Sequence, residues 1–349
     1  MRKLLLGTTA LAAAAALSAN AALADVSISG YYEWKYQSTS SDITANDGTT
    51  FGSDSEIAFK FSNKTDSGLD LGLTVEMYSD GDEANNTDEA SLSIAGGFGK
   101  IVLGQNDGVG DNYGVASTDL PAEEIYAGVG TDNDMVLVNA DINGLSGDSN
   151  KVSYHLPAMG GLTAGVSFMN SGAAGAKDST EFGAKYSMDA GGAAVTIGYA
   201  SGTTEASGSQ DTDTTVIGVK VSSGNITAAV SQSTYESAAV AFKAGSASTG
   251  AKARVADVKA KDQADEESIG ASVSFKVNDG LTLTAHTKET DDGVTTESYS
   301  NSGIEIAYTI ASGLTAYINV EDYEYKAGNS TNNTDNSGTA SKLTLKATF

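Results

Sequence analysis

Apolar and polar residues alternate with a period of two along much of this chain. Between residues 55 and 62, Ile57, Phe59 and Phe61 share one parity, and polar or small residues occupy the other. The same alternation occurs at residues 69–77, 162–168, 269–277, 304–310 and 343–349. Because successive side chains of a strand point to opposite faces, the pattern predicts strands with one apolar face. Such strands suit either a soluble sandwich or a barrel in lipid.

Short glycine-containing turns separate pairs of these segments. They lie at residues 66–68, 96–97, 160–161, 191–192, 223–224, 279–280 and 312–313. Most follow one another at intervals of about 31 to 34 residues, which is room for two membrane-spanning strands and one loop. The repeat therefore predicts a series of antiparallel hairpins.

Long polar loops alternate with the short turns. They are rich in Ser, Asn, Asp and Gly and lie at residues 38–50, 79–88, 171–178, 201–213, 291–297 and 327–340. Short turns at one end and long loops at the other are typical of an outer-membrane barrel. Seven turns separate eight strand–loop–strand units. We therefore expect an all-β, antiparallel transmembrane barrel of 16 strands in residues 25–349, with periplasmic turns and extracellular loops.

Two intervals between turns are longer and predict inserted loops, at residues 108–143 and 237–267. The first is rich in glycine and acidic residues and contains Pro121, so we expect it to be irregular or briefly helical. The second is alanine-rich and carries Lys243, Lys252, Arg254, Lys259 and Lys261. This insertion is either a solvated surface loop or a short external helix.

The N-terminal residues have the pattern of a secretory signal peptide. Arg2 and Lys3 precede an apolar stretch at residues 4–17, and small residues lead to Ala24. We expect residues 1–24 to be removed after export. The alternative, an N-terminal membrane anchor, is disfavoured because the apolar stretch is short and polar residues follow it. No later window reaches the roughly 18 apolar residues of a membrane-spanning helix.

Composition excludes several classes of function. The chain has no cysteine and a net charge of −25, and Arg254 is its one arginine after residue 24. Thiolate chemistry, disulfides and nucleic-acid partners are therefore excluded. His155 and His286 have no partner spacing that suggests a general base, so we do not expect an enzyme. We expect no cofactor, although acidic loops, such as the one with Asp80, Asp82 and Glu83, could bind Ca²⁺.

Three segments resemble the general porins of Gram-negative bacteria, especially the alphaproteobacterial type. They are residues 64–73 (KTDSGLDLGL), 90–104 (ASLSIAGGFGKIVLG) and 342–349 (KLTLKATF). The resemblance implies a barrel in the cell outer membrane that forms a homotrimer, with its third loop folded into the pore. It further implies passive diffusion of ions and small hydrophilic solutes through a water-filled channel. It also implies that the terminal Phe349 is the signal read by the outer-membrane assembly machinery.

Charged residues of the first insertion are the candidates for the narrowest part of such a pore. The acidic side would be formed by Asp107, Asp111, Asp119, Glu123, Glu124, Asp132 and Asp134. The opposite, basic wall would be formed by lysines whose parity opposes the apolar stripe of their strands: Lys35, Lys60, Lys342 and Lys346. Because rings of carboxylates favour cations, we expect weak cation selectivity. The alternative for the insertion is a solvated acidic loop outside the barrel.

Two other classes of function remain as alternatives. A non-conducting barrel that acts as a surface adhesin or structural protein would need a plugged lumen with bulky apolar residues on the inward parity, and the sequence mostly lacks them. A secreted β-roll would show glycine–aspartate nonapeptides, which are absent. The sequence thus favours an open channel.

Overall fold

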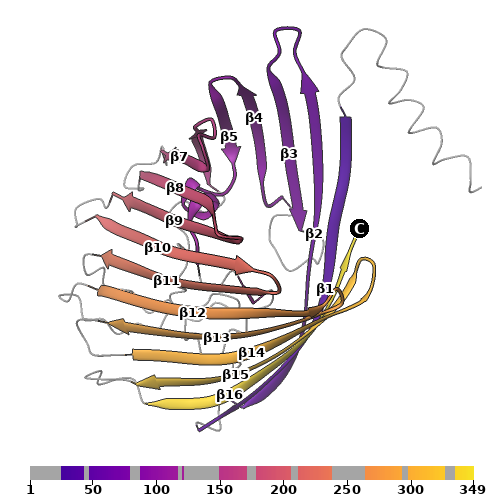
Figure 1. Ribbon diagram of the computed structural model, residues 1–349, viewed down its shortest axis with the longest axis vertical. Coiled ribbons are helices and arrows are strands. Elements are labelled where there is room, and N and C mark those ends of the chain that lie inside the picture. Colours follow the sequence, from indigo (N-terminus) through magenta and orange to yellow (C-terminus); the bar gives the residue numbers. More distant parts are fainter. Residues whose placement is uncertain are drawn as a thin grey trace, which may run out of the picture.

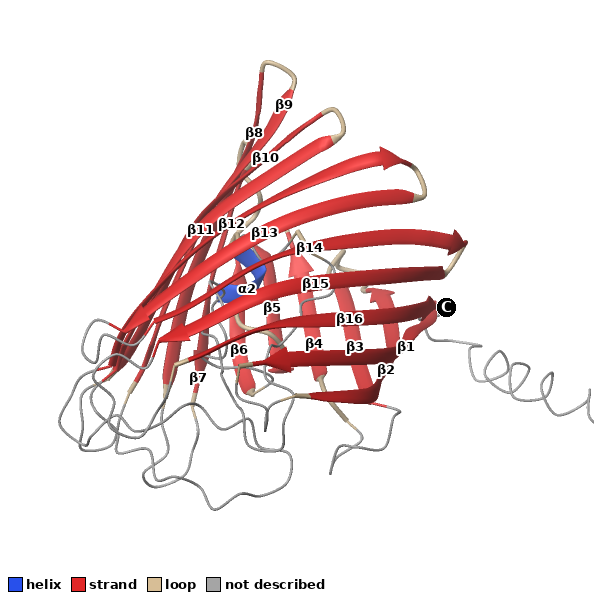
Figure 2. Cartoon of the chain, turned by 90° about the horizontal axis from the view of Figure 1, so that it is seen from below, coloured by secondary structure: helices blue, strands red, loops and turns tan. Residues whose placement is uncertain are grey.

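The described residues of the computed structural model form one closed antiparallel β-barrel (Figures 1 and 2). The structure describes residues 25–42, 47–78, 87–116, 120–121, 149–170, 178–205, 211–237, 264–292, 298–326 and 335–349. Each strand pairs with its neighbours in sequence, and β1 pairs with β16 to close the barrel. The predicted fold class, an all-β barrel of sixteen strands, is confirmed in these residues.

The strands follow one another in sequence order. In the first half they are β1 (Asp25–Ser41), β2 (Gly48–Lys64), β3 (Asp70–Tyr78), β4 (Ala90–Gly96), β5 (Gly99–Gln105), β6 (Asn150–His155), β7 (Leu162–Met169) and β8 (Ser179–Ala190). In the second half they are β9 (Ala193–Thr204), β10 (Thr212–Ser223), β11 (Ile226–Ser237), β12 (Ala264–Asn278), β13 (Leu281–Asp292), β14 (Ser298–Ala311), β15 (Leu314–Lys326) and β16 (Asn336–Thr348). A short helix, α2 (Val109–Tyr113), follows β5. Within the described residues, no helix is both long enough and apolar enough to cross a membrane.

All seven predicted turns lie at one end of the barrel, where each joins an even-numbered strand to the next odd-numbered strand. Glycine is needed in several of them because the backbone is left-handed. Gly191 and Gly192, between β8 and β9, have φ of 68° and 91°, a region that residues with a Cβ seldom adopt. The turn positions predicted from sequence are therefore correct, and they fix the order of the hairpins.

Several strands extend further toward the long-loop end than the sequence predicts. The loop expected at residues 38–50 is shortened because β1 and β2 remain paired as far as Thr39 and Gly48. The second insertion, expected to end at residue 267, is replaced from Ala264 onward by β12. Most of that insertion, with its basic residues, lies outside the described residues. Backbone hydrogen bonds between strands thus continue beyond the apolar parts of the strands.

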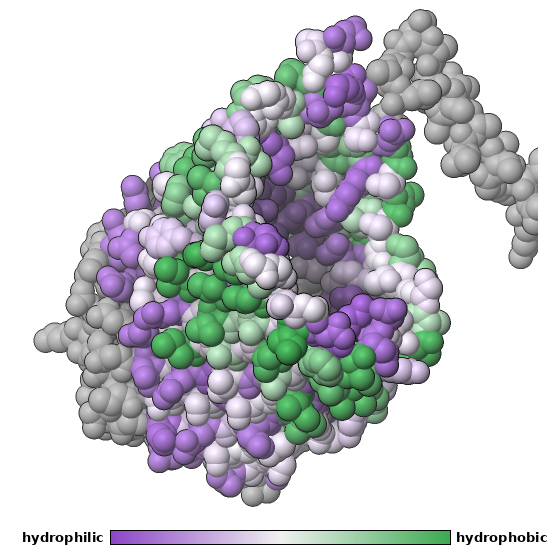
Figure 3. Space-filling model, in the orientation of Figure 1, coloured by the Kyte–Doolittle hydropathy of each residue, from purple (hydrophilic) through white to green (hydrophobic). Residues whose placement is uncertain are grey.

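The barrel has apolar residues outside and polar residues inside. Large side chains such as Val230 and Ile269 are 57% and 52% exposed, whereas the polar side chains Ser153, Asn319 and Glu305 are at most 2% exposed. In Figure 3, hydrophobic residues cover much of the outer wall, and the hollow visible in this view is lined mainly by hydrophilic residues. The arrangement reverses that of a water-soluble protein and matches a wall between lipid and a polar lumen.

A lysine on the outer face is expected to destabilise the barrel much more than a lysine on the inner face. Val230 lies on the outer face in the middle part of β11, and the nearby Thr227 has the opposite parity and is half-buried. We expect Val230→Lys to lower the free energy of unfolding by about 2–4 kcal/mol, because the charge would lie in hydrocarbon. Thr227→Lys should lower the free energy of unfolding by less, because its charge would lie in the polar lumen. Urea unfolding in lipid vesicles measures both, and equal losses would contradict the assignment of the two faces.

Candidate pore constriction

The segment that follows β5 turns into the barrel and packs against the inner face of its wall. Helix α2 lies against β7, β8 and β9, and Figures 1 and 2 both show it within the ring of strands. Val109, Val115 and Ala116 of this segment are buried. The described part of the first insertion contains one short helix, which fits the expectation of an irregular or briefly helical loop, and it lies inside the lumen.

A row of four glycines makes room for this inserted segment. The glycine track consists of Gly165, Gly183, Gly198 and Gly218, one on each of β7 to β10. A Cβ atom at Gly183 would lie 2.5 Å from the Val109 carbonyl oxygen, and one at Gly198 would lie 2.6 Å from Val115 Cγ2. Glycine within a strand commonly marks the close approach of another backbone. The track thus allows the segment to lie directly on the sheet.

Polar side chains of the wall accept hydrogen bonds from the start of α2. Ser167 Oγ accepts the Val109 N–H at 3.0 Å, and Glu181 Oε2 accepts the Gly110 N–H at 3.3 Å. The Ser167 hydroxyl in turn donates to Glu181 at 3.0 Å. The first N–H groups of a helix have no partner within the helix, so these two acceptors stabilise α2 in its position on the wall.

Basic side chains of the wall bind the same segment through its carbonyl oxygens. Lys185 Nζ donates to the carbonyl of Asn112 at 3.1 Å, and Lys151, which is 4% exposed, donates to the carbonyl of Asn106. Lys151 and Lys185 therefore hold the segment at both ends of α2.

Tyr113 adds a side-chain contact between α2 and β6. Its hydroxyl lies 2.8 Å from His155 Nδ1, and the two rings are 5.7 Å apart. Burial raises the pKa of the Tyr113 phenol above its usual value, so the hydroxyl keeps its proton at ordinary pH. His155, for which the sequence showed no partner, thus contacts the inserted segment.

The predicted acidic residues are only partly described. Asp107 and Asp111 lie on either side of the start of α2, and both are exposed. The other five predicted residues lie outside the described part of the chain: Asp119, Glu123, Glu124, Asp132 and Asp134.

The predicted basic wall has carboxylates between its lysines. Lys35 Nζ lies 2.8 Å from Glu33 and 3.3 Å from Asp54, and Lys346 Nζ lies 2.5 Å from Glu33. Strand parity predicts the inward direction of these lysines but does not indicate that Glu33 and Asp54, which have the same parity, bind them.

The other two predicted lysines lie at different places on the inner wall. Lys60 lies nearer the short-turn end, and its Nζ is 3.9 Å from Glu76. Lys342 is 8% exposed and lies beside Asn319 of β15. The four lysines therefore do not form a single exposed row of positive charge.

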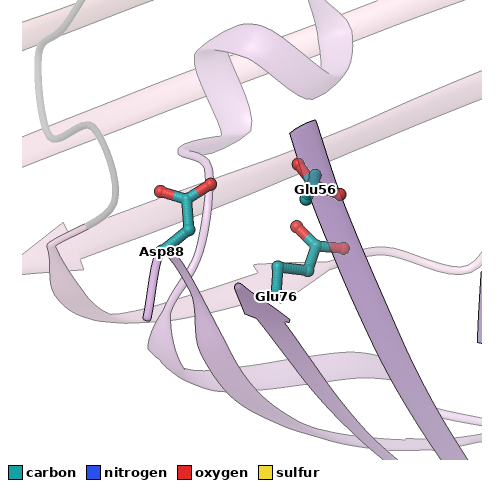
Figure 4. A group of neighbouring side chains, drawn as sticks. All are labelled: Glu56, Glu76 and Asp88. Carbon is teal, nitrogen blue, oxygen red and sulfur yellow. The ribbon is translucent and has the colours of Figure 1, made fainter. Parts of the chain in front are cut away.

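Three carboxylates gather on the inner side of β2 and β3 (Figure 4). Oxygen atoms of Glu56, Glu76 and Asp88 lie within 4.8 Å of one another. Asp88 ends the loop that carries Asp80, Asp82 and Glu83, the residues for which sequence suggested Ca²⁺, and those three lie outside the described residues. Acidic groups near a surface gather in this way without a metal, so the cluster by itself assigns no ion.

A buried polar cluster on β13 to β15 was not expected from sequence. His286 Nε2 lies 3.1 Å from Glu321, and Asn301 donates to the same carboxylate at 3.3 Å. Gly303 lies between His286 and Glu321 in the register of the strands and leaves the space in which the two side chains meet. The partner of His286 comes from a strand two places away, so spacing along the chain does not reveal it.

The sequence matches one family model over most of its length. The model is described as Gram-negative porin and matches residues 7–329. No curated protein matches the sequence.

Solved structures of outer-membrane proteins share the fold at low sequence identity. A loop-deletion mutant of OmpT, an outer membrane protein of Vibrio cholerae, is 15% identical, with a TM-score of 0.66 and coverage of 93% of this chain and 99% of that one. An anion-selective porin from Comamonas acidovorans is 16% identical, with a TM-score of 0.62 and coverage of 93% and 100%. A porin refined at 1.8 Å resolution is 17% identical, with a TM-score of 0.61 and the same coverage. At these identities the likeness concerns the fold.

Proposed function

The chain belongs to the Gram-negative porin family and forms an outer-membrane channel for the passive diffusion of solutes, and we propose that this channel weakly prefers cations. The observation that supports the proposal is the inserted segment on the glycine track, on which Asp107 and Asp111 are exposed. Carboxylates that line a narrow passage lower the energy of a cation there and raise that of an anion.

The rest of the first insertion supports the same preference. Between residues 108 and 143 it contains no lysine or arginine but seven acidic residues: Asp111, Asp119, Glu123, Glu124, Asp132, Asp134 and Asp141. The wall on the far side offers little compensating charge, because Lys35 and Lys346 are paired with Glu33. The anion selectivity of the Comamonas acidovorans porin is a property of that protein, and we expect the opposite sign here.

The channel acts without a chemical step, and we propose that it is not an enzyme and uses no cofactor. The solutes would be ions and small hydrophilic molecules, since the described inner wall is polar. A non-conducting adhesin or structural barrel is the alternative that electrical measurements exclude or establish.

We further propose how the chain is exported and inserted into the outer membrane. Residues 1–24 act as a cleaved signal peptide, and residues 25–349 are the barrel of the mature protein. Phe349, which is 84% exposed beside the apolar stripe of β16, is the signal for the outer-membrane assembly machinery. The assembled protein is a homotrimer; a trimer form has been described for the Vibrio cholerae OmpT protein.

Planar bilayers with a KCl gradient test the proposed selectivity. We expect the purified protein to give an ohmic conductance. The sign of its reversal potential should show that K⁺ permeates more readily than Cl⁻. Neutralising Asp107, Asp111, Asp119, Glu123, Glu124, Asp132 and Asp134 together to Asn or Gln should abolish this preference, because these residues supply most of the acidic charge in and next to the insertion. An unchanged reversal potential would show that the insertion does not set the selectivity. A silent bilayer would favour the adhesin alternative.

A further inference from the structure

Four charged side chains meet on the inner wall where the first and last strands close the barrel. The Glu33 network consists of Glu33 and Lys35 of β1, Asp54 of β2 and Lys346 of β16. Glu33 lies opposite Lys346 in one strand pair and opposite Asp54 in the other, so the three form a single row across the wall. Lys35 lies two residues further along β1 and reaches both Glu33 and Asp54.

Glu33 is the buried centre of this network. Its side chain is 5% exposed, whereas those of Lys35, Lys346 and Asp54 are 29%, 28% and 35% exposed. The Lys346 ammonium also lies 4.4 Å from the centre of the Tyr31 ring. A solute in the lumen therefore meets the two ammonium groups and Asp54, with the Glu33 carboxylate behind them.

The charges of the network balance as long as Glu33 is ionised. Two lysines and two carboxylates carry equal and opposite charge, and Glu33 contacts both lysines at 2.8 and 2.5 Å. Without the Glu33 carboxylate, the four side chains of the network would carry one excess positive charge. One buried group thus determines whether the four side chains of the Glu33 network are together neutral or positive.

The network faces the inserted segment across the lumen. In the closed order of strands, β1 is eight strands from β9 in either direction, and Gly198 of β9 lies against Val115 of the segment. Glu33 and Gly198 both lie in the middle part of their strands. The Glu33 network and the described segment around α2 therefore lie on opposite sides of the lumen.

We propose that Glu33 is a selectivity-determining residue of the channel: it balances the charges of Lys35 and Lys346, so that these lysines do not oppose the cation preference set by the insertion. The inference rests on the proposed function and concerns the same passage. An ion about 8 Å from an added unit charge, screened at about 0.1 M salt, changes its occupancy by roughly 1.5-fold. Because cations and anions respond oppositely, the permeability ratio should change by about twofold.

Two single variants should shift the selectivity in opposite directions. Glu33→Gln leaves the network with one excess positive charge, and we expect the cation-to-anion permeability ratio to fall by about twofold. Lys346→Met leaves the network with one excess negative charge and should raise the cation-to-anion permeability ratio by a similar factor. The double variant Glu33→Gln/Lys346→Met restores balance, and its reversal potential should return to the wild-type value.

A matched control removes one carboxylate charge at a position that does not face the lumen. Glu324 of β15 is exposed, has the outward parity and pairs with Lys326 at 3.1 Å, so Glu324→Gln should leave the reversal potential unchanged. The measurement is the zero-current potential of each variant under one KCl gradient. Equal potentials for Glu33→Gln and Glu324→Gln, or shifts of the same sign for Glu33→Gln and Lys346→Met, would overturn the proposal. The sign of the zero-current potential of the wild type tests the proposed cation preference. The differences in zero-current potential between the variants test the role of Glu33.

Discussion

Replacing Gly218 with alanine is expected to lower the single-channel conductance. The added Cβ would overlap the carbonyl oxygen of Val115, which is backbone and cannot rotate away. The inserted segment must then move off the wall, and the open side is the lumen. Overpacking of this kind costs about 1–3 kcal/mol. Planar-bilayer recordings should show a smaller and noisier unit current.

Gly52 provides the matched control for that variant. It also lies on the inner face, on β2, and a Cβ there would meet only Lys35 Cβ, at an ordinary 3.9 Å. Gly52→Ala should therefore conduct like the wild type. If Gly218→Ala and Gly52→Ala gave the same unit conductance, the glycine track would not determine the position of the segment.

Replacing Lys151 with methionine should have the opposite effect on the pore. The Lys151 ammonium is buried and donates to the carbonyl of Asn106, just before the inserted helix. Hydrogen bonds to charged groups stabilise by about 1.5–3 kcal/mol, so their loss should release this end of the segment. We expect a larger, fluctuating conductance and faster liposome swelling with larger sugars.

A control at Lys220 distinguishes the loss of the hydrogen bond that anchors the segment from the loss of a positive charge in the lumen. Lys220 lies on the inner face of β10, two residues beyond Gly218, and is partly exposed. Lys220→Met removes the same charge and should leave the size limit in liposome swelling unchanged. An equal change in size limit for both variants would mean that charge, and not anchoring, explains the result.

The sequence predicts the fold well because two local rules determine it. Short glycine-containing motifs, such as Gly191-Gly192 with its positive φ angles, mark the turns, and strict alternation between the turns shows which face of each strand meets lipid. Loop boundaries are less predictable, because polar strands such as the end of β1 remain paired beyond the lipid-facing part. Nothing local distinguishes a polar strand end from a loop.

The candidate constriction is less predictable, because its partners come from distant strands. Glu33 has the same parity as Lys35, but its contact with Lys346 joins the first strand to the last and depends on register. The glycine track had a readable signal, namely inward-facing glycines in four consecutive strands, whose meaning becomes clear only when α2 is seen to lie on them.

The most direct test of the account asks whether α2 lies in the path of the ions. The chain has no cysteine, so Asp111→Cys introduces a single thiol on the exposed side of α2, and Glu324→Cys places one on the outer face as a control. A bulky thiol reagent should reduce the current through open Asp111→Cys channels in discrete steps and leave Glu324→Cys channels unchanged. A current through Asp111→Cys channels that does not respond, although mass spectrometry shows the thiol to be modified, would place the segment outside the conducting path and contradict the account.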